Sequence, residues 1–338
     1  MKLIKTEDAV GHVLCHDMTK IVPGVEKGAK FRKGHIVTEA DVPELLAMGK
    51  EHSYIWEKKE GILHEDEAAE ILCKICKGAN IGRTQPREGK IELLAECDGL
   101  LKINRERLLA VNSLGEMMIA TRHGDFPVKK GDRLGATRVI PLVIEEKKMK
   151  RVQDAAGSEP LLSILPFCNK RIGIVTTGSE VFLGRIEDGF GPAIRRKLAE
   201  YDVEIIGQTI LGDEPEKITA EILRYIEMGA DMVLTTGGMS VDPDDTTPTA
   251  IKAASTDVVS YGAPVLPGAM FLLGYRGEVP ILGLPGCVMY AKRTIFDLVL
   301  PRVLAGERLT KEDLYAYGEG GLCLSCDNCT FPNCGFGK

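Results

Sequence analysis

The sequence predicts an α/β protein whose largest unit is a doubly wound, mostly parallel sheet. From about residue 165 to 308, apolar runs alternate with amphipathic runs, which is typical of parallel strands covered by helices. The preceding residues carry short apolar runs separated by turn residues, and four of the ten cysteines fall in the last sixteen residues. The expected parts are a small β-rich module at 1–58, an α+β module at 59–164, the α/β domain at 165–310 and a cysteine-rich tail at 311–338.

The first module is predicted from its glycine spacing. Gly24, Gly28 and Gly34 interrupt short apolar pieces, which favours short strands and tight turns. A helix is expected over residues 41–48, because Gly49 follows the last apolar position and glycine commonly ends helices.

The second module is predicted to contain two helices among short strands. "HEDEAAEILCKICKGANIG" (64–82) starts with acidic residues and ends with glycine, as helices often do. The charged run "EEKKMKRVQD" (145–154) predicts a helix that leads out of the module.

The third module shows the clearest alternation. Strands are expected over 171–178, 203–211, 231–238 and 279–286, and helices over 191–202, 215–229, from 247 onward, and over 288–307. In such sheets ligands bind beyond the carboxyl ends of the strands.

Composition excludes some classes of protein. Hydrophobic residues make up 44% of the chain and charged residues 27%, which is ordinary for a globular protein. The net charge of −6 argues against general nucleic-acid binding. We expect no membrane span, because no apolar run approaches about 20 residues, and the polar start of the chain favours the cytoplasm.

The stretch "TTGGMSVDPDDTTP" (235–248) follows an apolar strand and has the composition of a ligand loop. Gly237 and Gly238 would let the backbone approach a ligand, and a helix beginning near Thr247 and Pro248 would offer its positive end to a phosphate. The nearby aspartates are candidate ligands of a divalent cation such as Mg²⁺: Asp242, Asp244 and Asp245.

Three other loops follow expected strands with similar composition: "TTGSEV" (176–181), "LGDEPEKI" (211–218) and "GLPGC" (283–287). One glycine pair after a strand is usually structural, and a single aspartate there often caps a helix. Four such loops at one sheet edge instead favour a site for an anionic, phosphorylated small molecule.

These motifs resemble, in order and spacing, those of the molybdopterin-binding domain shared by molybdopterin adenylyltransferase and molybdopterin molybdenumtransferase. The resemblance covers residues 170–308 and implies an α/β domain that binds molybdopterin. It implies catalytic roles for Asp213 and Asp245, with Asp245 near the metal and the phosphates. The cofactor-binding residues that it implies are Thr177, Gly178, Ser179, Glu180, Glu214, Gly237, Gly238, Ser240, Thr247, Pro248, Gly283, Pro285 and Gly286.

The chain departs from the metal-inserting branch at three positions. Ala269 stands where that branch has a lysine, Cys287 stands where it has an asparagine, and Ser179 replaces an aspartate. The cysteine tail also takes the place of the β-barrel that usually ends those enzymes. These departures bear on catalysis more than on pterin binding.

The tail "CLSCDNCTFPNCGFGK" has the spacing C-x2-C-x2-C-x4-C. Its cysteines are candidate ligands of an iron–sulfur cluster or of zinc, and the alternative is an unstructured, reducible tail. They are Cys323, Cys326, Cys329 and Cys334. Cys73 and Cys76 are a candidate redox pair or buried residues, and burial is also expected for Cys15, Cys97 and Cys168.

Three hypotheses for function follow. The first is a transferase of molybdenum or tungsten cofactor biosynthesis, with Mg²⁺ held by Asp213 and Asp245 and with molybdate or tungstate and ATP as further partners. The second is a noncatalytic carrier of molybdopterin, whose tail docks a molybdoenzyme or redox partner. The third is a nucleotide-dependent hydrolase on the same fold. The resemblance also implies a homo-oligomer.

Overall fold

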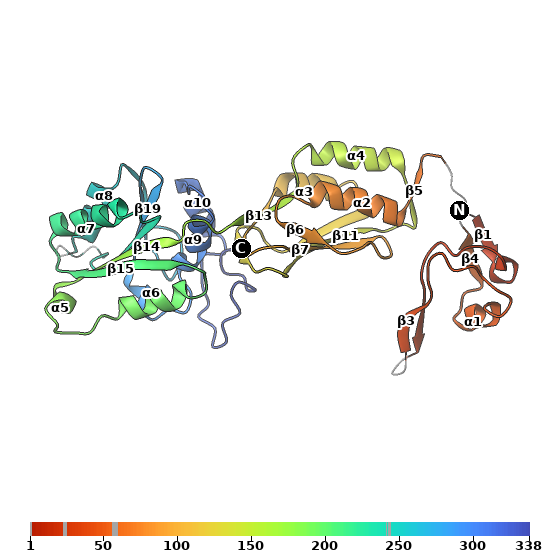
Figure 1. Cartoon of the computed structure of the whole chain (residues 1–338), viewed down its shortest axis with the longest axis horizontal. Coiled ribbons are helices and arrows are strands. Elements are labelled where there is room, and N and C mark those ends of the chain that lie inside the picture. Colours follow the sequence, from red (N-terminus) through yellow and green to blue (C-terminus); the bar gives the residue numbers. More distant parts are fainter. Residues whose placement is uncertain (1, 23–25, 56–59, 241, 243–244) are drawn as a thin grey trace. The chain divides into compact units, whose positions relative to one another are not determined.

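A computed structural model describes residues 2–22, 26–55, 60–240, 242 and 245–338 (Figure 1). The chain divides into two compact units. The first comprises residues 1–96, 103–122 and 130–163, and the second comprises residues 97–102, 123–129 and 164–338. None of the helices within the described residues is both long and apolar enough to cross a membrane.

The described residues of the first unit form four small antiparallel sheets. The strand pairings are β1 with β4, β2 with β3, β5 with β12, and the four-stranded order β6-β7-β11-β9. The strands are β1 Lys2–Lys5, β2 Met18–Val22, β3 Glu26–Phe31, β4 His52–Ile55, β5 Ile62–His64, β6 Ile81–Arg83, β7 Lys90–Ala95, β9 Met117–Thr121, β11 Arg133–Val139 and β12 Val143–Glu145. The helices are α1 Val42–Ala47, α2 Glu65–Cys76, α3 Arg105–Asn112 and α4 Glu146–Ala156, with a 3-10 turn η1 at Thr6–Ala9.

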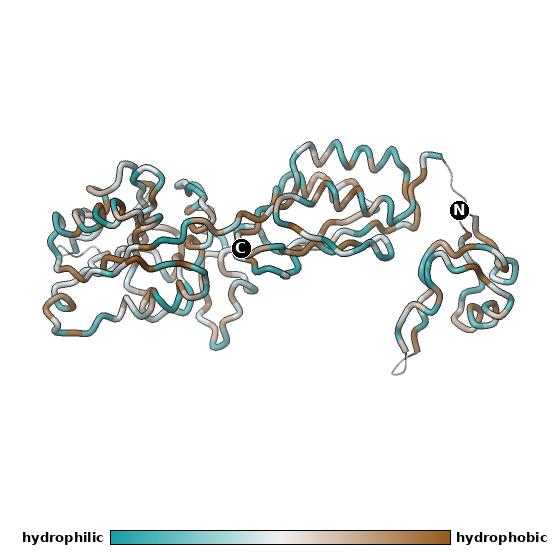
Figure 2. The backbone as a smooth tube through the Cα atoms, in the orientation of Figure 1, coloured by the Kyte–Doolittle hydropathy of each residue, from teal (hydrophilic) through white to brown (hydrophobic). Residues whose placement is uncertain are grey.

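The helices expected in this unit are confirmed, and their sequences explain them. Helix α2 begins at a capping box, in which His64 accepts a hydrogen bond from the backbone N–H of Asp66 and Glu67 accepts one from that of His64. Helix α4 is mostly hydrophilic, drawn largely in teal and white in Figure 2, and it buries only Met149, Val152 and Ala156. Such a narrow apolar face is typical of a helix that covers one side of a sheet.

The second unit is built on a six-stranded sheet in the order β15-β14-β16-β19-β18-β17. The four strands from β15 to β19 are parallel, and β18 and β17 add antiparallel pairs at one edge. The strands are β14 Arg171–Thr177, β15 Glu204–Leu211, β16 Met232–Thr236, β17 Asp257–Tyr261, β18 Leu272–Arg276 and β19 Val279–Leu284. The helices are α5 Ser179–Phe182, α6 Phe190–Leu198, α7 Pro215–Glu227, α8 Thr247–Ala254, α9 Ile295–Leu304 and α10 Lys311–Tyr315, with 3-10 turns η2 Gly286–Met289 and η3 Ala316–Gly318. A separate sheet has the order β10-β8-β13, from β8 Gly99–Ile103, β10 Phe126–Val128 and β13 Leu162–Pro166.

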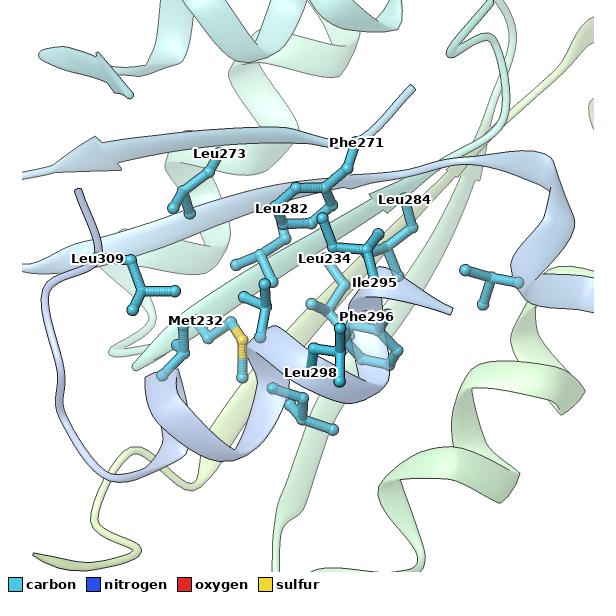
Figure 3. Packing of buried hydrophobic residues seen from close by; sticks show 14 of the residues in the cluster. Met232, Leu234, Phe271, Leu273, Leu282, Leu284, Ile295, Phe296, Leu298 and Leu309 are labelled. Atoms are coloured by element: carbon cyan, nitrogen blue, oxygen red, sulfur yellow. The ribbon is translucent and has the colours of Figure 1, made fainter. Parts of the chain in front are cut away.

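The six-stranded sheet is covered on both faces, which confirms the doubly wound prediction. Val175, Val233 and Ile281 pack in one apolar cluster with residues of α7 and α8. Their chain neighbours Ile174, Leu234 and Leu282 pack in a second cluster with residues of α6 and α9. Figure 3 shows Leu234 and Leu282 in this cluster together with Ile295, Phe296 and Leu298 of α9. Because successive side chains of a strand point to opposite faces, continuous apolar runs are what a sheet buried on both faces requires.

Two features differ from the sequence expectation. The helix expected over 288–307 begins only at Ile295, because Thr294 and Asp297 form a capping box there. Before it, Gly286–Met289 forms the short 3-10 turn η2. The edge strands β17 and β18 were not predicted. Their apolar runs are short, and no amphipathic helical run separates them as it separates the parallel strands.

The cysteine tail folds against the second unit, so the alternative of an unstructured tail is wrong. The backbone N–H of Cys323 donates to the carbonyl of Leu266 over 2.8 Å, and the backbone N–H of Leu266 donates to the carbonyl of Gly321 over 2.8 Å. Phe336 is buried within the apolar cluster that includes α9. These contacts fix both ends of the tail.

Candidate functional site

An open cleft of about 600 Å³ lies beyond the carboxyl ends of β14, β16 and β19. It occupies the position expected for a ligand site in a doubly wound sheet. Eight of the residues implied by the resemblance line it: Thr177, Glu180, Gly237, Gly238, Ser240, Asp245, Pro285 and Gly286. The other seven do not line it: Gly178, Ser179, Asp213, Glu214, Thr247, Pro248 and Gly283.

Gly237 is the tightest point of the cleft wall. Its φ of +87° lies in the left-handed region, and a Cβ placed there would lie 2.0 Å from the carbonyl oxygen of Thr177. Only glycine allows β16 to end so close to the end of β14. The backbone at the end of β16 therefore packs directly against the backbone at the end of β14 in the wall of the cleft.

Thr177 and Thr247 join the cleft wall to helix α8. Their hydroxyl oxygens lie 2.8 Å apart, and the Thr177 hydroxyl also donates to the carbonyl of Thr236 over 3.2 Å. Thr247 is buried and begins α8 as predicted, with Pro248 beside it, also buried. Thr247 and Pro248 thus form the start of the helix and do not line the cleft.

The carboxylate of Asp245 is held at the cleft by the loop that carries it. Its Oδ2 accepts a hydrogen bond from the backbone N–H of Ser240 over 2.6 Å, and the backbone N–H of Asp245 donates to the carbonyl of Asp242 over 3.0 Å. The Tyr261 hydroxyl donates to the carbonyl of Met239 over 2.9 Å, which ties the loop to β17. Burial, and secondarily the charge of Asp245, raises the pKa of Tyr261. Asp244, the third aspartate singled out in the sequence, lies outside the described residues.

Asp213 lies beside the cleft and not among its lining residues. Its Oδ2 accepts a hydrogen bond from the backbone N–H of Ser179 over 2.8 Å, and its carbonyl accepts one from the Thr246 hydroxyl over 2.8 Å. Asp213 therefore connects the loop after β14, the loop after β15 and the residue next to Asp245. Glu214 is the N-cap position of α7 and forms an ion pair with Lys217.

The "GLPG" loop contributes through two glycines of different kinds. A Cβ on Gly283 would lie 2.6 Å from Cε of Met239 and 2.8 Å from Cδ1 of Ile251, so Gly283 allows close packing beneath the loop. A Cβ on Gly286 would meet nothing within 4 Å, and Gly286 lines the cleft with Pro285. Gly178, with a φ of +137°, makes the turn from β14 into α5.

The cleft is acidic. Its lining includes the carboxylates of Glu180, Glu187 and Asp245, and the described residues that line it include no lysine, arginine or histidine. Ala269 and Cys287, two of the departures noted in the sequence, both line it. Burial raises the pKa of the Cys287 thiol. An anion would therefore have to bind through backbone N–H groups, hydroxyl groups, helix ends or a bound cation.

Sequence reasoning missed several lining residues. Glu187 and Gly189 lie between α5 and α6, and Met289 and Tyr290 follow the "GLPG" loop. No motif marks these residues. The one available signal was position, because the residues after a strand and before the next helix lie at the ligand-binding edge.

The four tail cysteines line a second pocket, of about 250 Å³. Cys323 and Cys334 are half-buried, whereas Cys326 and Cys329 are exposed. No three of their sulfur atoms lie within 4.8 Å of one another; among the described residues that spacing is met only by His64, Glu65 and Asp66, at the start of α2. Cys15, Cys73 and Cys76 are buried as expected, but Cys97 is only half-buried and Cys168 is exposed.

Comparison with known proteins adds two family matches. Residues 173–305 match a family described as a probable molybdopterin binding domain. Residues 3–57 match a family described as a domain of unknown function (DUF8806).

Similar individual proteins include CinA-like proteins of Mycobacterium avium (strain 104) and Mycobacterium tuberculosis (strain H37Rv). They are 43% and 44% identical over 77 residues, which is 23% of this chain and 18% of each relative. The chain thus spans about a fifth of the length of these curated relatives.

Two solved structures are similar to part of the chain. The molybdopterin biosynthesis enzyme MoaB of Thermus thermophilus is 29% identical, with a TM-score of 0.36, over 41% of this chain and 98% of that one. The tungsten cofactor synthesizing protein MoaB of Pyrococcus furiosus is 25% identical, with a TM-score of 0.31, over 36% and 84%. The match to the molybdopterin-binding domain family covers residues 173–305, which include the strand ends and loops that line the cleft.

Proposed function

We propose that the cleft binds molybdopterin, or its adenylate, together with Mg²⁺, and that the protein acts in molybdenum or tungsten cofactor biosynthesis. The observation that carries the proposal is the family match of residues 173–305, which include the loops that form the cleft. Molybdopterin carries a phosphate and a dithiolene on a flat ring system. The cleft, at about 600 Å³, has a volume within the range of small-molecule sites.

The charges in the cleft support a requirement for a cation. Three carboxylates and a phosphate would repel one another, and no basic side chain of the described lining offsets them. Mg²⁺ prefers oxygen ligands and is commonly held by one or two carboxylates together with substrate phosphates. The residues present fit this role, with Asp245 and Glu180 as the side chains that would hold the ion.

When bound, Mg²⁺ would neutralise charge on the phosphate oxygens. The chain's own residues would do the rest. The ends of β14 and β16 would set the backbone against the ligand, and the Ser240 N–H holds the Asp245 carboxylate in place. Asp213, bonded to Ser179 and Thr246, would position the two loops on either side. Catalysis of this kind consists of positioning and charge neutralisation and needs no protein nucleophile.

A noncatalytic carrier is the second candidate, and the cleft gives it specific support. Ala269 lines the cleft at the position where the resembled metal-inserting enzymes have a lysine, so a cation that would hold molybdate or phosphate is missing there. A carrier needs affinity for the pterin but no second anion site.

The deciding experiment measures binding and turnover separately on the full chain. Molybdopterin binding is titrated with and without Mg²⁺, and adenylylation with ATP and metal insertion with molybdate or tungstate are then assayed. We expect Mg²⁺-dependent binding that Asp245→Asn weakens by about tenfold or more, corresponding to the loss of one charged ligand contact. Asp202→Asn is the matched control, because Asp202 is an exposed carboxylate paired with Lys170 and does not line the cleft.

The outcomes separate the candidates. Turnover that depends on Asp245 supports the enzyme, whereas tight binding without turnover supports the carrier. The pterin proposal is refuted if the purified chain binds no molybdopterin at any Mg²⁺ concentration. Cleavage of a dinucleotide in the absence of pterin would favour a hydrolase instead.

A further inference from the structure

The cysteine tail forms a built pocket separate from the pterin cleft. Cys323, Cys326, Cys329 and Cys334 all line it, and all four are free thiols. Four cysteines grouped at one pocket are candidate metal ligands, because the thiolate of cysteine is the form that binds metals. The arrangement indicates a site for a ligand that thiolates bind.

The tail is anchored on both sides of the pocket. The Lys292 ammonium donates to the carbonyl of Asp327 over 2.6 Å and to that of Cys326 over 3.2 Å. The Arg293 guanidinium lies 4.8 Å from the ring centre of Phe331, and the ring centres of Phe331 and Phe336 lie 6.1 Å apart. The thiols are therefore presented by a fixed loop, which is the condition for a preorganised metal site.

We propose that these four thiolates bind one iron–sulfur cluster of the four-iron type. Thiolates select soft metal centres, and runs of the form C-x2-C-x2-C are typical of protein loops that wrap such clusters. In two-cluster ferredoxins the fourth cysteine of the run serves the other cluster. Here Cys334, one residue further along than in that run, lines the same pocket as the first three. One pocket thus collects a complete set of four ligands.

The spacing of the thiols is wider than a single zinc ion requires. With Zn–S bonds of about 2.3 Å in a tetrahedron, neighbouring sulfurs lie roughly 3.8 Å apart. In this tail, all of which the structure describes, no three sulfurs lie within 4.8 Å of one another. A four-iron cluster spreads its thiolates further, because each binds a different iron atom. The pocket, at about 250 Å³, also exceeds the space that a single ion fills.

The electrostatics of the pocket agree with this ligand. On binding, each of the four thiols releases its proton to solvent and forms one Fe–S bond, so no electron is taken from the protein. The resulting centre is anionic, and the Lys292 ammonium, which among the described residues is bonded only to carbonyl oxygens, lines the same pocket.

The test is metal analysis of the full chain purified without oxygen and then reconstituted with equal amounts of ferrous and ferric iron and with sulfide, which supply the two iron oxidation states of the cluster. We expect about four iron and four sulfide per chain, with the broad visible absorbance of a cluster that dithionite bleaches. A second sample is offered Zn²⁺ in competition. One zinc per chain with no iron, or no stoichiometric metal at all, overturns the proposal.

Matched variants make the assignment specific. Cys326→Ser and Cys329→Ser change exposed thiols, so the fold is retained, which circular dichroism verifies. Each should weaken cluster retention by more than about tenfold, since losing even an outer partner of a metal ligand has an effect of that size. Cys168→Ser, an exposed thiol outside the pocket, should retain the full iron content. Unchanged iron in both tail variants refutes the site. Pterin binding is measured on the same samples, so failure of either proposal is seen independently of the other.

Discussion

Substituting Gly237 with alanine tests whether close contact of two strand ends builds the cleft. The substitution adds two penalties. A φ of +87° places alanine in the left-handed region, which destabilises by about 1–2 kcal/mol. The new Cβ would also lie 2.0 Å from the Thr177 carbonyl oxygen, so backbone must move, which adds about 1–3 kcal/mol. The expected loss of unfolding free energy is therefore about 2–5 kcal/mol.

Two other glycines separate these penalties. Gly184 has a φ of +69°, but a Cβ added to it would meet no atom within 4 Å, so Gly184→Ala carries only the backbone penalty. Gly286 lines the cleft but has neither a left-handed φ nor an atom within 4 Å of an added Cβ. The unfolding free energy of Gly286→Ala should therefore lie within about 0.5 kcal/mol of that of the original chain.

The assay is thermal and urea unfolding of the full chain, followed through the transition of the α/β unit. For a unit of this size each kcal/mol lowers the midpoint by roughly 2–4 °C. The expected order of stability, from highest to lowest, is Gly286→Ala, then Gly184→Ala, then Gly237→Ala. If Gly237→Ala and Gly184→Ala unfold at the same midpoint, the close approach of the strand ends adds no penalty, which refutes the reasoning.

Three further predictions concern stability and its dependence on pH. Lys197→Met should lower the free energy of urea unfolding by about 1–3 kcal/mol, because it removes one of the two basic partners of the buried Asp297 and leaves Arg293 as the other, whereas Lys170→Met, which breaks an exposed pair, should change it little. Thr294→Ala should lower the free energy of unfolding by about 1–2 kcal/mol, because it removes the side chain that caps α9. An unchanged urea midpoint would contradict the capping role. Burial raises the pKa of Glu65 to about 7, so the folded state holds its proton after the unfolded state has lost it, and stability of the first unit should fall as pH rises from the ordinary carboxyl range through about 7. Glu65→Gln should flatten that part of the pH profile, and an unaltered profile would contradict the assignment.

Much of the α/β fold could be predicted from sequence because its signals are local. Apolar runs such as "RIGIVTTG" and amphipathic runs such as "PEKITAEILRYIEMG" mark β14 and α7 directly. The late start of α9 could not be predicted from hydropathy alone. It depends on a three-residue cap between Thr294 and Asp297, which a continuous apolar pattern obscures.

The site could be predicted in part, for a related reason. Glycines at strand ends, such as Gly237 and Gly238, are visible as a motif and do line the cleft. Asp213 does not line the cleft, because its carboxylate accepts a hydrogen bond from the backbone N–H of Ser179. The sequence alone does not show that contact. Glu187 and Tyr290 reach the cleft through tertiary packing of segments that carry no pattern of their own.

The segment between β19 and α9 belongs to both pockets. Pro285, Cys287 and Tyr290 line the cleft at the ends of β14, β16 and β19, and Lys292 and Arg293 line the cysteine pocket. Filling either pocket therefore acts on backbone that shapes the other. Thermodynamic linkage makes such an effect mutual: if a centre in the cysteine pocket changes the affinity for the pterin by some factor, bound pterin changes the affinity for that centre by the same factor.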